Sequence, residues 1–99
     1  MITVKVTYTV KPSFVAQNLQ NIQTFMQDFQ KMGNDFQYAV YTNENTFTHL
    51  SHYKNEDIQA AVLNTPTFKA FQQRRDDSGL LIAPQIEVLN LAASVREVL

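Results

Sequence analysis

The 99-residue sequence contains no cysteine and no tryptophan, and it has only two glycines. Without cysteine, the chain cannot form a disulfide, a zinc–thiolate site or an iron–sulfur cluster, and this absence fits a reducing compartment. Two glycines are also too few for a glycine-rich loop that cradles phosphate. The composition therefore excludes thiol chemistry and a nucleotide-binding loop of that type.

Targeting signals and concentrated charge are missing as well. The start, Met1 to Lys5, has no basic stretch followed by an apolar one, and no apolar run approaches the roughly 18 residues of a membrane span. We therefore expect a cytoplasmic protein with no membrane partner. The net charge is −1, and the one basic pair, Arg74-Arg75, is followed by Asp76-Asp77, which cancels its field locally. Because no basic patch remains, we expect no nucleic-acid partner.

The length and the hydrophobic pattern predict a single domain over residues 1–99. Residues Ile2 to Val10 alternate between apolar and polar side chains, which is typical of a half-buried β-strand. Apolar residues then recur at three- and four-residue steps from Phe14 to Met32 and predict an amphipathic helix. Ser13 is the expected N-cap of this helix, and Gly33 is expected to close it.

The second half of the sequence predicts a hairpin, two short helices and a last strand. Two aromatic-rich segments, Phe36 to Tyr41 and Phe47 to Tyr53, predict antiparallel strands joined by a loop at residues 42–46. Asn55 and Thr65 are of the residue types that favour helix N-caps. The remaining expectations are a loop at 76–79, a strand from Ile86 to Leu91 that begins just after Pro84, and a tail from Ala92 to Leu99 that forms a brief helix or lies on a partner.

The resulting order, β-α-β-β-α-α-β, predicts an α+β domain of the ferredoxin-like type, with helices on one face of a four-stranded antiparallel sheet. The other face of such a sheet is open. One helical layer cannot cover all the apolar strand residues, and the surplus includes Tyr41, Phe47, Leu50 and Leu89. We therefore expect a homodimer in which a second copy covers the open sheet face.

Residues 46–71 resemble the antibiotic biosynthesis monooxygenase family of dimeric α+β barrels. In that family, a strand that carries Glu-x-Trp or Glu-x-Tyr is followed by a charged cap and a short helix, and then by a Thr/Ser-Pro-His-Phe-like start of another helix. The corresponding segments here are Ser51-His52-Tyr53, Lys54 to Asp57, and Thr65-Pro66-Thr67-Phe68. The resemblance implies a dimeric α+β barrel with an aromatic-lined pocket. It also implies a monooxygenase that needs no cofactor and acts on a small aromatic or quinol-type molecule.

The sequence departs from this family pattern at several positions. Ser51 stands where the family usually has Glu, Thr67 replaces the His after Pro66, and Val62 replaces a His often found at the end of the first short helix. Haem-degrading relatives use a Trp, which this chain lacks, so we expect no haem and no other cofactor. The lost carboxylate and imidazoles favour an alternative function, a non-catalytic dimer that binds a small hydrophobic ligand or a partner.

His49 and His52 are the only histidines, and their odd spacing on one predicted strand directs them to opposite faces. We therefore expect no metal site from a single chain. His52 lies near the strand end, where a solvated surface role is expected. His49 is central to the strand, where it is either a pocket acid/base near neutral pH or a hydrogen-bonded structural residue. The family resemblance favours His49 as the proton acceptor.

Six aromatic rings fall on the first three predicted strands. They either pack the core and a dimer interface or line a pocket for a flat aromatic ligand, with phenol groups as polar handles. Under the pocket interpretation, we expect the substrate-binding residues to be Tyr8, Tyr38, Ser51, Tyr53 and Phe68.

Overall fold

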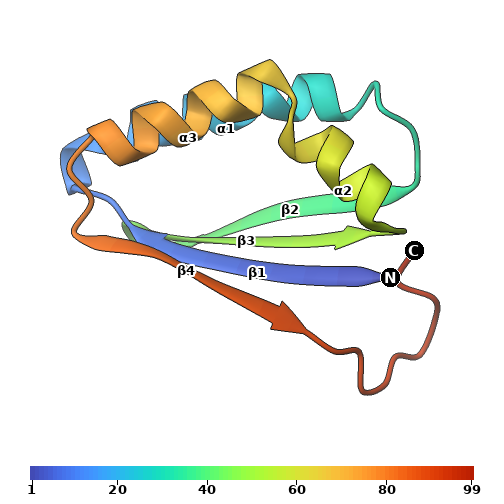
Figure 1. The fold of residues 1–99 in the computed structure, drawn as a ribbon. Coiled ribbons are helices and arrows are strands. Elements are labelled where there is room, and N and C mark those ends of the chain that lie inside the picture. Colours follow the sequence, from blue (N-terminus) through green and yellow to red (C-terminus); the bar gives the residue numbers. More distant parts are fainter.

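A computed structural model describes all 99 residues, and its elements follow the predicted order with one short 3₁₀ helix added (Figure 1). The fold is therefore the α+β ferredoxin-like arrangement expected from the sequence. The elements are β1 (Ile2–Thr9), η1 (Pro12–Phe14), α1 (Val15–Phe29), β2 (Phe36–Asn43), β3 (Thr46–Tyr53), α2 (Glu56–Leu63), α3 (Pro66–Asp77) and β4 (Ile82–Leu89).

The four strands form one antiparallel sheet in the order β2-β3-β1-β4, and all the helices lie on one side of it (Figure 1). Tyr8 of β1 pairs with Phe47 of β3, and Val6 pairs with His49. Directly paired residues share a face of the sheet. All four of these side chains therefore face the helices, and the pairing brings Tyr8 and His49 together from distant parts of the sequence.

Phe25 of α1 occupies the centre of the core and is 0% exposed. Its ring centroid lies 5.0 Å from that of Phe71 and 5.1 Å from that of Phe68, both on α3. A further edge-to-face contact, at 5.6 Å, joins Phe25 to Tyr38 of β2. Aromatic pairs in such tilted and edge-to-face arrangements stabilise a core beyond the area that they bury. Phe25 thus joins the two long helices to the sheet.

The helix starts agree only in part with the sequence expectations. Asn55 caps α2 as expected, because its side chain accepts a hydrogen bond of 2.9 Å from the backbone N–H of Ile58. Thr65 stands at the N-cap position of α3, but its side chain makes no capping bond. The expected Ser13 cap is wrong, since Ser13 lies inside η1 and Phe14 stands at the N-cap position of α1.

The helix ends also differ from the sequence expectations. The helix expected to reach Met32 ends at Phe29, and the chain then turns through Gly33, which has a φ of +87°. Glycine takes this left-handed conformation without steric cost. At the other end of the molecule, α3 continues through Asp77, so Asp76 and Asp77 lie in its last turn and not in the expected loop.

The β2–β3 hairpin is tighter than expected. The strands extend to Asn43 and from Thr46, so only Glu44 and Asn45 remain between them. Glu44 takes a φ of +55°, a left-handed value that non-glycine residues seldom adopt. The Asn45 side chain donates a hydrogen bond of 2.7 Å to the carbonyl of Val10, which ties the turn to the end of β1. This tertiary bond favours a turn that the local sequence alone does not predict.

Strand β4 begins and ends earlier than expected, at Ile82 and Leu89, and Pro84 lies within it. The proline is tolerated because β4 is an edge strand and because its pairing with β1 shifts register between Thr7 and Thr9, opposite Pro84. The tail from Ala92 to Leu99 forms no helix.

Most of the strongly exposed apolar strand residues lie on β4, and of the expected surplus Tyr41 (59% exposed) and Leu89 (38% exposed) are indeed uncovered. Phe47, expected among the surplus, is 0% exposed beneath the helices. Ile86 and Val88 are each 70% exposed, although they pair with Val6 and Val4 and therefore face the helical side of the sheet. The helices do not extend over β4, so an apolar strip remains open along this edge.

Truncation of the central aromatic residue tests this description of the core. We expect Phe25→Ala to lower the free energy of unfolding by about 3–5 kcal/mol, because it removes a buried ring and leaves a cavity. Urea unfolding followed by circular dichroism measures the change. Leu19 lies on the same helix but is 39% exposed, so Leu19→Ala is the matched control and should lower the free energy of unfolding far less. Equal losses in the two variants would contradict the central position of Phe25.

Candidate functional site

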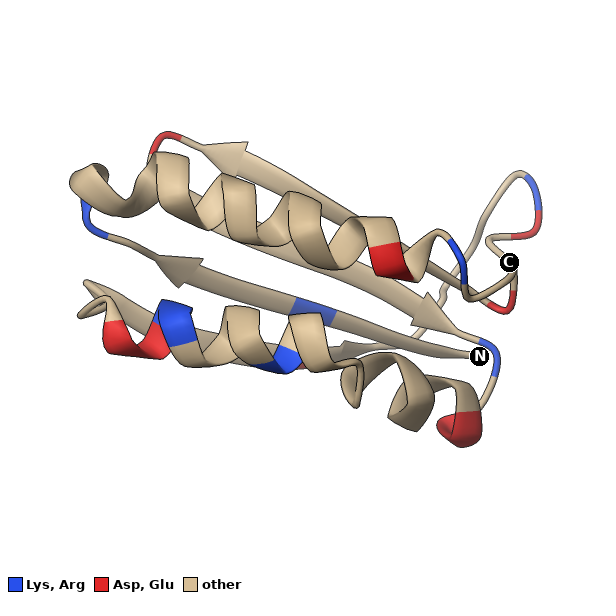
Figure 2. Ribbon diagram, turned by 90° about the horizontal axis from the view of Figure 1, so that it is seen from above, with Lys and Arg blue, Asp and Glu red and all other residues tan.

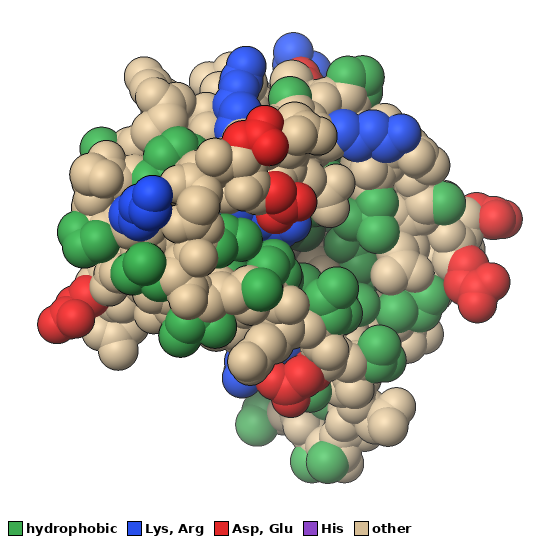
Figure 3. Space-filling view, turned by 60° about the vertical axis from the view of Figure 1, so that its left-hand side comes forward, with side chains coloured by type: hydrophobic (Ala, Val, Ile, Leu, Met, Phe, Trp, Pro, Cys, Tyr) green, Lys and Arg blue, Asp and Glu red, His purple; other side chains and the backbone are tan.

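A cavity of about 250 Å³ lies between the helical layer and the β1–β4 side of the sheet. Hydrophobic side chains gather around a hollow on this side of the molecule in the space-filling view (Figure 3). A mostly apolar wall with a few polar groups is typical of sites for small organic molecules. The lining residues are Val4, Val6, Tyr38, His49, Ser51, Tyr53, Gln59, Leu63, Phe68, Phe71, Gln72, Arg75, Pro84, Ile86 and Val88.

The alternation of β3 decides which of its side chains reach the cavity. His49, Ser51 and Tyr53 are buried beneath the helices, whereas His52 points to the open face. The two histidines thus lie on opposite faces, as their spacing predicts. Of the residues predicted for the site, those that line the cavity are Tyr38, His49, Ser51, Tyr53 and Phe68; Tyr8 lies behind this wall, in contact with His49.

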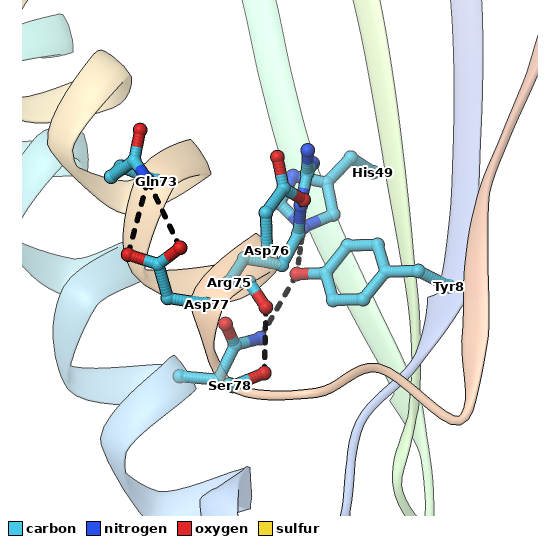
Figure 4. A network of polar contacts seen from close by, with 8 residues as sticks. Tyr8, His49, Gln73, Arg75, Asp76, Asp77 and Ser78 are labelled. Carbon is cyan, nitrogen blue, oxygen red and sulfur yellow. Dashed lines mark hydrogen bonds and ion pairs between the residues drawn. The ribbon is translucent and has the colours of Figure 1, made fainter.

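His49 is 3% exposed, and both of its ring nitrogens are engaged by tyrosine hydroxyls. The Nε2 atom lies 2.7 Å from Oη of Tyr8, and the Nδ1 atom lies 2.7 Å from Oη of Tyr38. Asn18 of α1 donates from Nδ2 to the same Tyr8 oxygen at 2.9 Å. Figure 4 shows the contact between Tyr8 and His49 beside the last turn of α3. Four elements therefore meet in one chain of hydrogen bonds.

The direction of this chain follows from counting protons. Because Asn18 donates to the Tyr8 oxygen, the hydroxyl proton of Tyr8 has Nε2 of His49 as its acceptor. The imidazole then carries its proton on Nδ1 and donates it to Oη of Tyr38. The hydroxyl proton of Tyr38, which lines the cavity, is left for a ligand. The buried amide oxygen of Asn18 has no hydrogen-bond partner. If this amide turned over, its oxygen would accept from Tyr8 and the direction of every hydrogen bond in the chain would reverse. Tyr38 would then donate to His49, and its oxygen would be free to accept from a ligand.

Burial sets the protonation states of the three titratable residues in this hydrogen-bond chain, Tyr8, His49 and Tyr38. Burial, followed by the positive charge of Arg75, lowers the pKa of His49 to about 3. The ring is therefore neutral near neutral pH. Of the two roles expected for His49, this state and its two hydrogen bonds fit the structural residue and not a group that titrates near neutral pH. Burial raises the pKa of Tyr8 to about 12 and the pKa of Tyr38 well above its ordinary value, so both hydroxyls keep their protons.

Arg75, which is not among the predicted site residues, also belongs to the site. Its side chain is 11% exposed and lines the cavity, with its guanidinium carbon 5.4 Å from the ring centroid of Tyr8 and 5.6 Å from that of Phe71. Asp76, whose side chain is 55% exposed, pairs with Nε at 3.0 Å. The spacing of Phe68, Phe71 and Arg75 on one helix face was the available signal.

The other charged residues are distributed over the surface. Lys and Arg are interspersed with Asp and Glu when the molecule is seen from above (Figure 2). No cluster of three or more His, Asp or Glu side chains is arranged to hold a metal ion. None of the helices has both the length and the apolar character needed to span a bilayer.

The lowered pKa of His49 predicts a pH dependence of stability. Between about pH 6.5 and pH 3, the unfolded chain binds a proton at His49 that the folded chain excludes, so stability falls as the pH falls through this window. Within this window, His49 changes the free energy of unfolding by up to about 1.4 kcal/mol per pH unit. We expect His49→Gln to lose this slope in urea unfolding between pH 4.5 and 7.5.

His52→Gln, on the open face, is the control for this measurement. Protonation of aspartate and glutamate affects both variants alike, so the difference between their slopes isolates His49. Identical slopes in His49→Gln, His52→Gln and the natural chain would show that His49 is not held neutral by the fold.

Comparison with known proteins gives the context of this site. The family model described as antibiotic biosynthesis monooxygenase matches residues 1–74. Among curated proteins, none matches the sequence.

Solved structures share the fold at low sequence identity. An antibiotic biosynthesis monooxygenase superimposes with a TM-score of 0.82 at 9% identity, and the match covers 94% of this chain and 100% of the other. A conserved protein from Methanosarcina mazei Go1 superimposes with a TM-score of 0.77 at 21% identity, and the match covers 89% of each chain. A Mycobacterium tuberculosis protein gives 0.81 at 9% identity, covering 96% of this chain and 98% of the other.

Proposed function

This chain belongs to the antibiotic biosynthesis monooxygenase family, and we propose that it is a monooxygenase that needs no cofactor and oxidises a small hydroxylated aromatic molecule. The observation that carries the proposal is the buried Tyr8–His49–Tyr38 chain, which ends at the wall of an aromatic-lined cavity. The flat substrate lies among Tyr38, Tyr53 and Phe68. Ser51 lies beside it at the position of the family carboxylate.

The substrate itself supplies the electrons in this reaction. Loss of a hydroxyl proton gives an electron-rich anion, which donates two electrons to O₂ and forms a carbon–oxygen bond. The hydroperoxide then loses water and leaves a quinone carbonyl. One oxygen atom thus remains in the product and the other leaves as water, so the balance closes without an external reductant.

The chain's own residues receive the proton. In the reversed direction of the hydrogen-bond chain, Oη of Tyr38 accepts the substrate proton while Tyr38 passes its own proton to Nδ1 of His49. Nε2–H of His49 then donates to Tyr8, and once the Asn18 amide has turned over, the Tyr8 hydroxyl donates to the amide oxygen that is unpartnered in the structure. The guanidinium of Arg75 favours the anion that forms in the cavity. His49 is therefore the proposed proton acceptor, acting through Tyr38.

A second function, a binding module without catalysis, is favoured by three observations. Ser51 supplies no carboxylate to the cavity, and both nitrogens of His49 are already bonded within the protein. With a pKa of about 3, His49 is also a weak base in the empty site. Under this alternative, the same cavity holds an aromatic molecule and releases it unchanged.

Oxygen uptake with hydroquinones and hydroxynaphthalenes distinguishes the two functions. We expect uptake above the protein-free rate, with ¹⁸O from ¹⁸O₂ appearing in the product by mass spectrometry. His49→Ala should lower the protein-dependent rate by about 10²–10⁴-fold, because it removes the proton acceptor. His52→Ala is the matched control and should retain the rate.

The outcomes of this assay separate the proposals. If both histidine variants behave alike, His49 is not the acceptor. If no substrate in the panel increases oxygen uptake while calorimetry still detects ligand binding, the binding module is the correct interpretation.

The family resemblance and the open apolar strip support a homodimer. Ile86 and Val88 on β4 are each 70% exposed, and Leu91 of the tail is 57% exposed. Apolar strips of this kind are seldom left open to water and often mark interfaces. A second copy packed against the helix-facing side of β4 would cover Ile86 and Val88 and close the cavity.

Light scattering tests the dimer directly. We expect the mass of two chains at micromolar concentration and the mass of one chain for Val88→Lys, because the new charge would be buried in the interface. Leu19→Lys changes an exposed apolar residue on α1 and should leave the dimer intact. A single-chain mass for the natural sequence would exclude this assembly.

A further inference from the structure

We infer that the ligand of this cavity is a planar aromatic molecule that carries one carboxylate, and that Arg75 binds this group. The inference rests on the proposed function in taking the same cavity as the substrate site, and it adds the charge of the substrate. It is carried by the placement of a single guanidinium, on a side chain that is 11% exposed, in an otherwise uncharged cavity.

Arg75 is the one residue lining the cavity that carries a formal charge at neutral pH. The other lining groups are apolar, amide or hydroxyl side chains, together with His49, which is neutral. A guanidinium whose side chain is only 11% exposed loses much of its hydration, and this loss is costly unless an anion compensates it. A cationic ligand would add repulsion, and a neutral ligand would leave the exposed carboxylate of Asp76 as the only compensating charge.

The existing partner of Arg75 leaves most of its donors free. Asp76 binds Nε at 3.0 Å from an exposed position, where water weakens its charge. No hydrogen bond within the chain uses the two terminal NH₂ groups of Arg75. These two groups form the fork that binds both oxygens of a carboxylate side by side.

Aromatic rings hold the guanidinium in place. Its carbon atom lies 5.4 Å from the ring centroid of Tyr8 and 5.6 Å from that of Phe71, so cation–π contacts from β1 and α3 restrain it. A group restrained in this way loses little further entropy when the ligand binds. Phe68, Phe71 and Tyr53 supply apolar walls for the aromatic part of the ligand, and the hydroxyl of Tyr38 supplies a second polar contact.

The probes are 2-naphthoate and 2-naphthamide, which have nearly the same shape and differ in charge. By isothermal titration calorimetry, we expect the natural chain to bind naphthoate about 10- to 100-fold more tightly than naphthamide, since charge-assisted hydrogen bonds are the stronger class. Arg75→Gln should remove this preference, and Arg75→Lys should retain part of it. Arg74→Gln removes the same charge from an exposed neighbouring position and should leave the preference unchanged.

Equal affinity for the two probes in the natural chain, or no detectable naphthoate binding at millimolar concentration, would overturn the inference without any need for a variant. A preference for naphthoate that survives in Arg75→Gln would overturn it as well. Oxygen uptake is measured separately, so the two proposals fail independently. A carboxylate preference without oxygen uptake would contradict the monooxygenase but retain the inferred ligand. Oxygen uptake without a carboxylate preference would retain the monooxygenase but contradict the inferred ligand.

Discussion

A buried imidazole needs a partner for each ring nitrogen, because an unsatisfied polar group away from water costs about 1–3 kcal/mol. His49 meets this need with Tyr8 on one side and Tyr38 on the other, and Asn18 completes the chain from α1. The bonds therefore tie β1, β2 and β3 to the first helix at one point. The position of the cavity wall, the charge state of His49 and the free proton of Tyr38 all depend on this arrangement.

The cavity exists because the helical layer and the sheet do not match in extent. The helices cover β1, β2 and β3, while Ile86 and Val88 of β4 face the same side without cover. These residues line the opening of the cavity as well as the apolar strip. One structural mismatch thus links the ligand site to the proposed dimer, since a second copy that covers β4 would also exclude water from the cavity.

The sequence predicts those features that depend on periodicity. Period two on β3 places His49 and His52 on opposite faces, and the three- and four-residue steps identify α1. The sequence does not predict features that depend on distant partners. The tight turn at Glu44 is held by a bond to the end of β1, and Asn18 is recognisable as a site residue only when Tyr8 lies beside it. Arg75 is not recognisable from its neighbours in sequence, since Asp76 and Asp77 balance its charge, and its place in the site depends on the helix face that it shares with Phe68 and Phe71.

Arg75 has two opposing effects on proton transfer. Its charge adds to burial in lowering the pKa of His49 to about 3, which weakens the proposed acceptor. The same charge lowers the pKa of any hydroxyl that ionises in the cavity, which makes the donor more acidic. Transfer depends on the difference between these two pKa values. The charge of Arg75 would favour ionisation of a ligand hydroxyl held nearer to it more than it disfavours protonation of His49, whereas burial opposes the ionisation of both groups. The placement of the ligand against Arg75 therefore sets the part of this pKa difference that the charge controls.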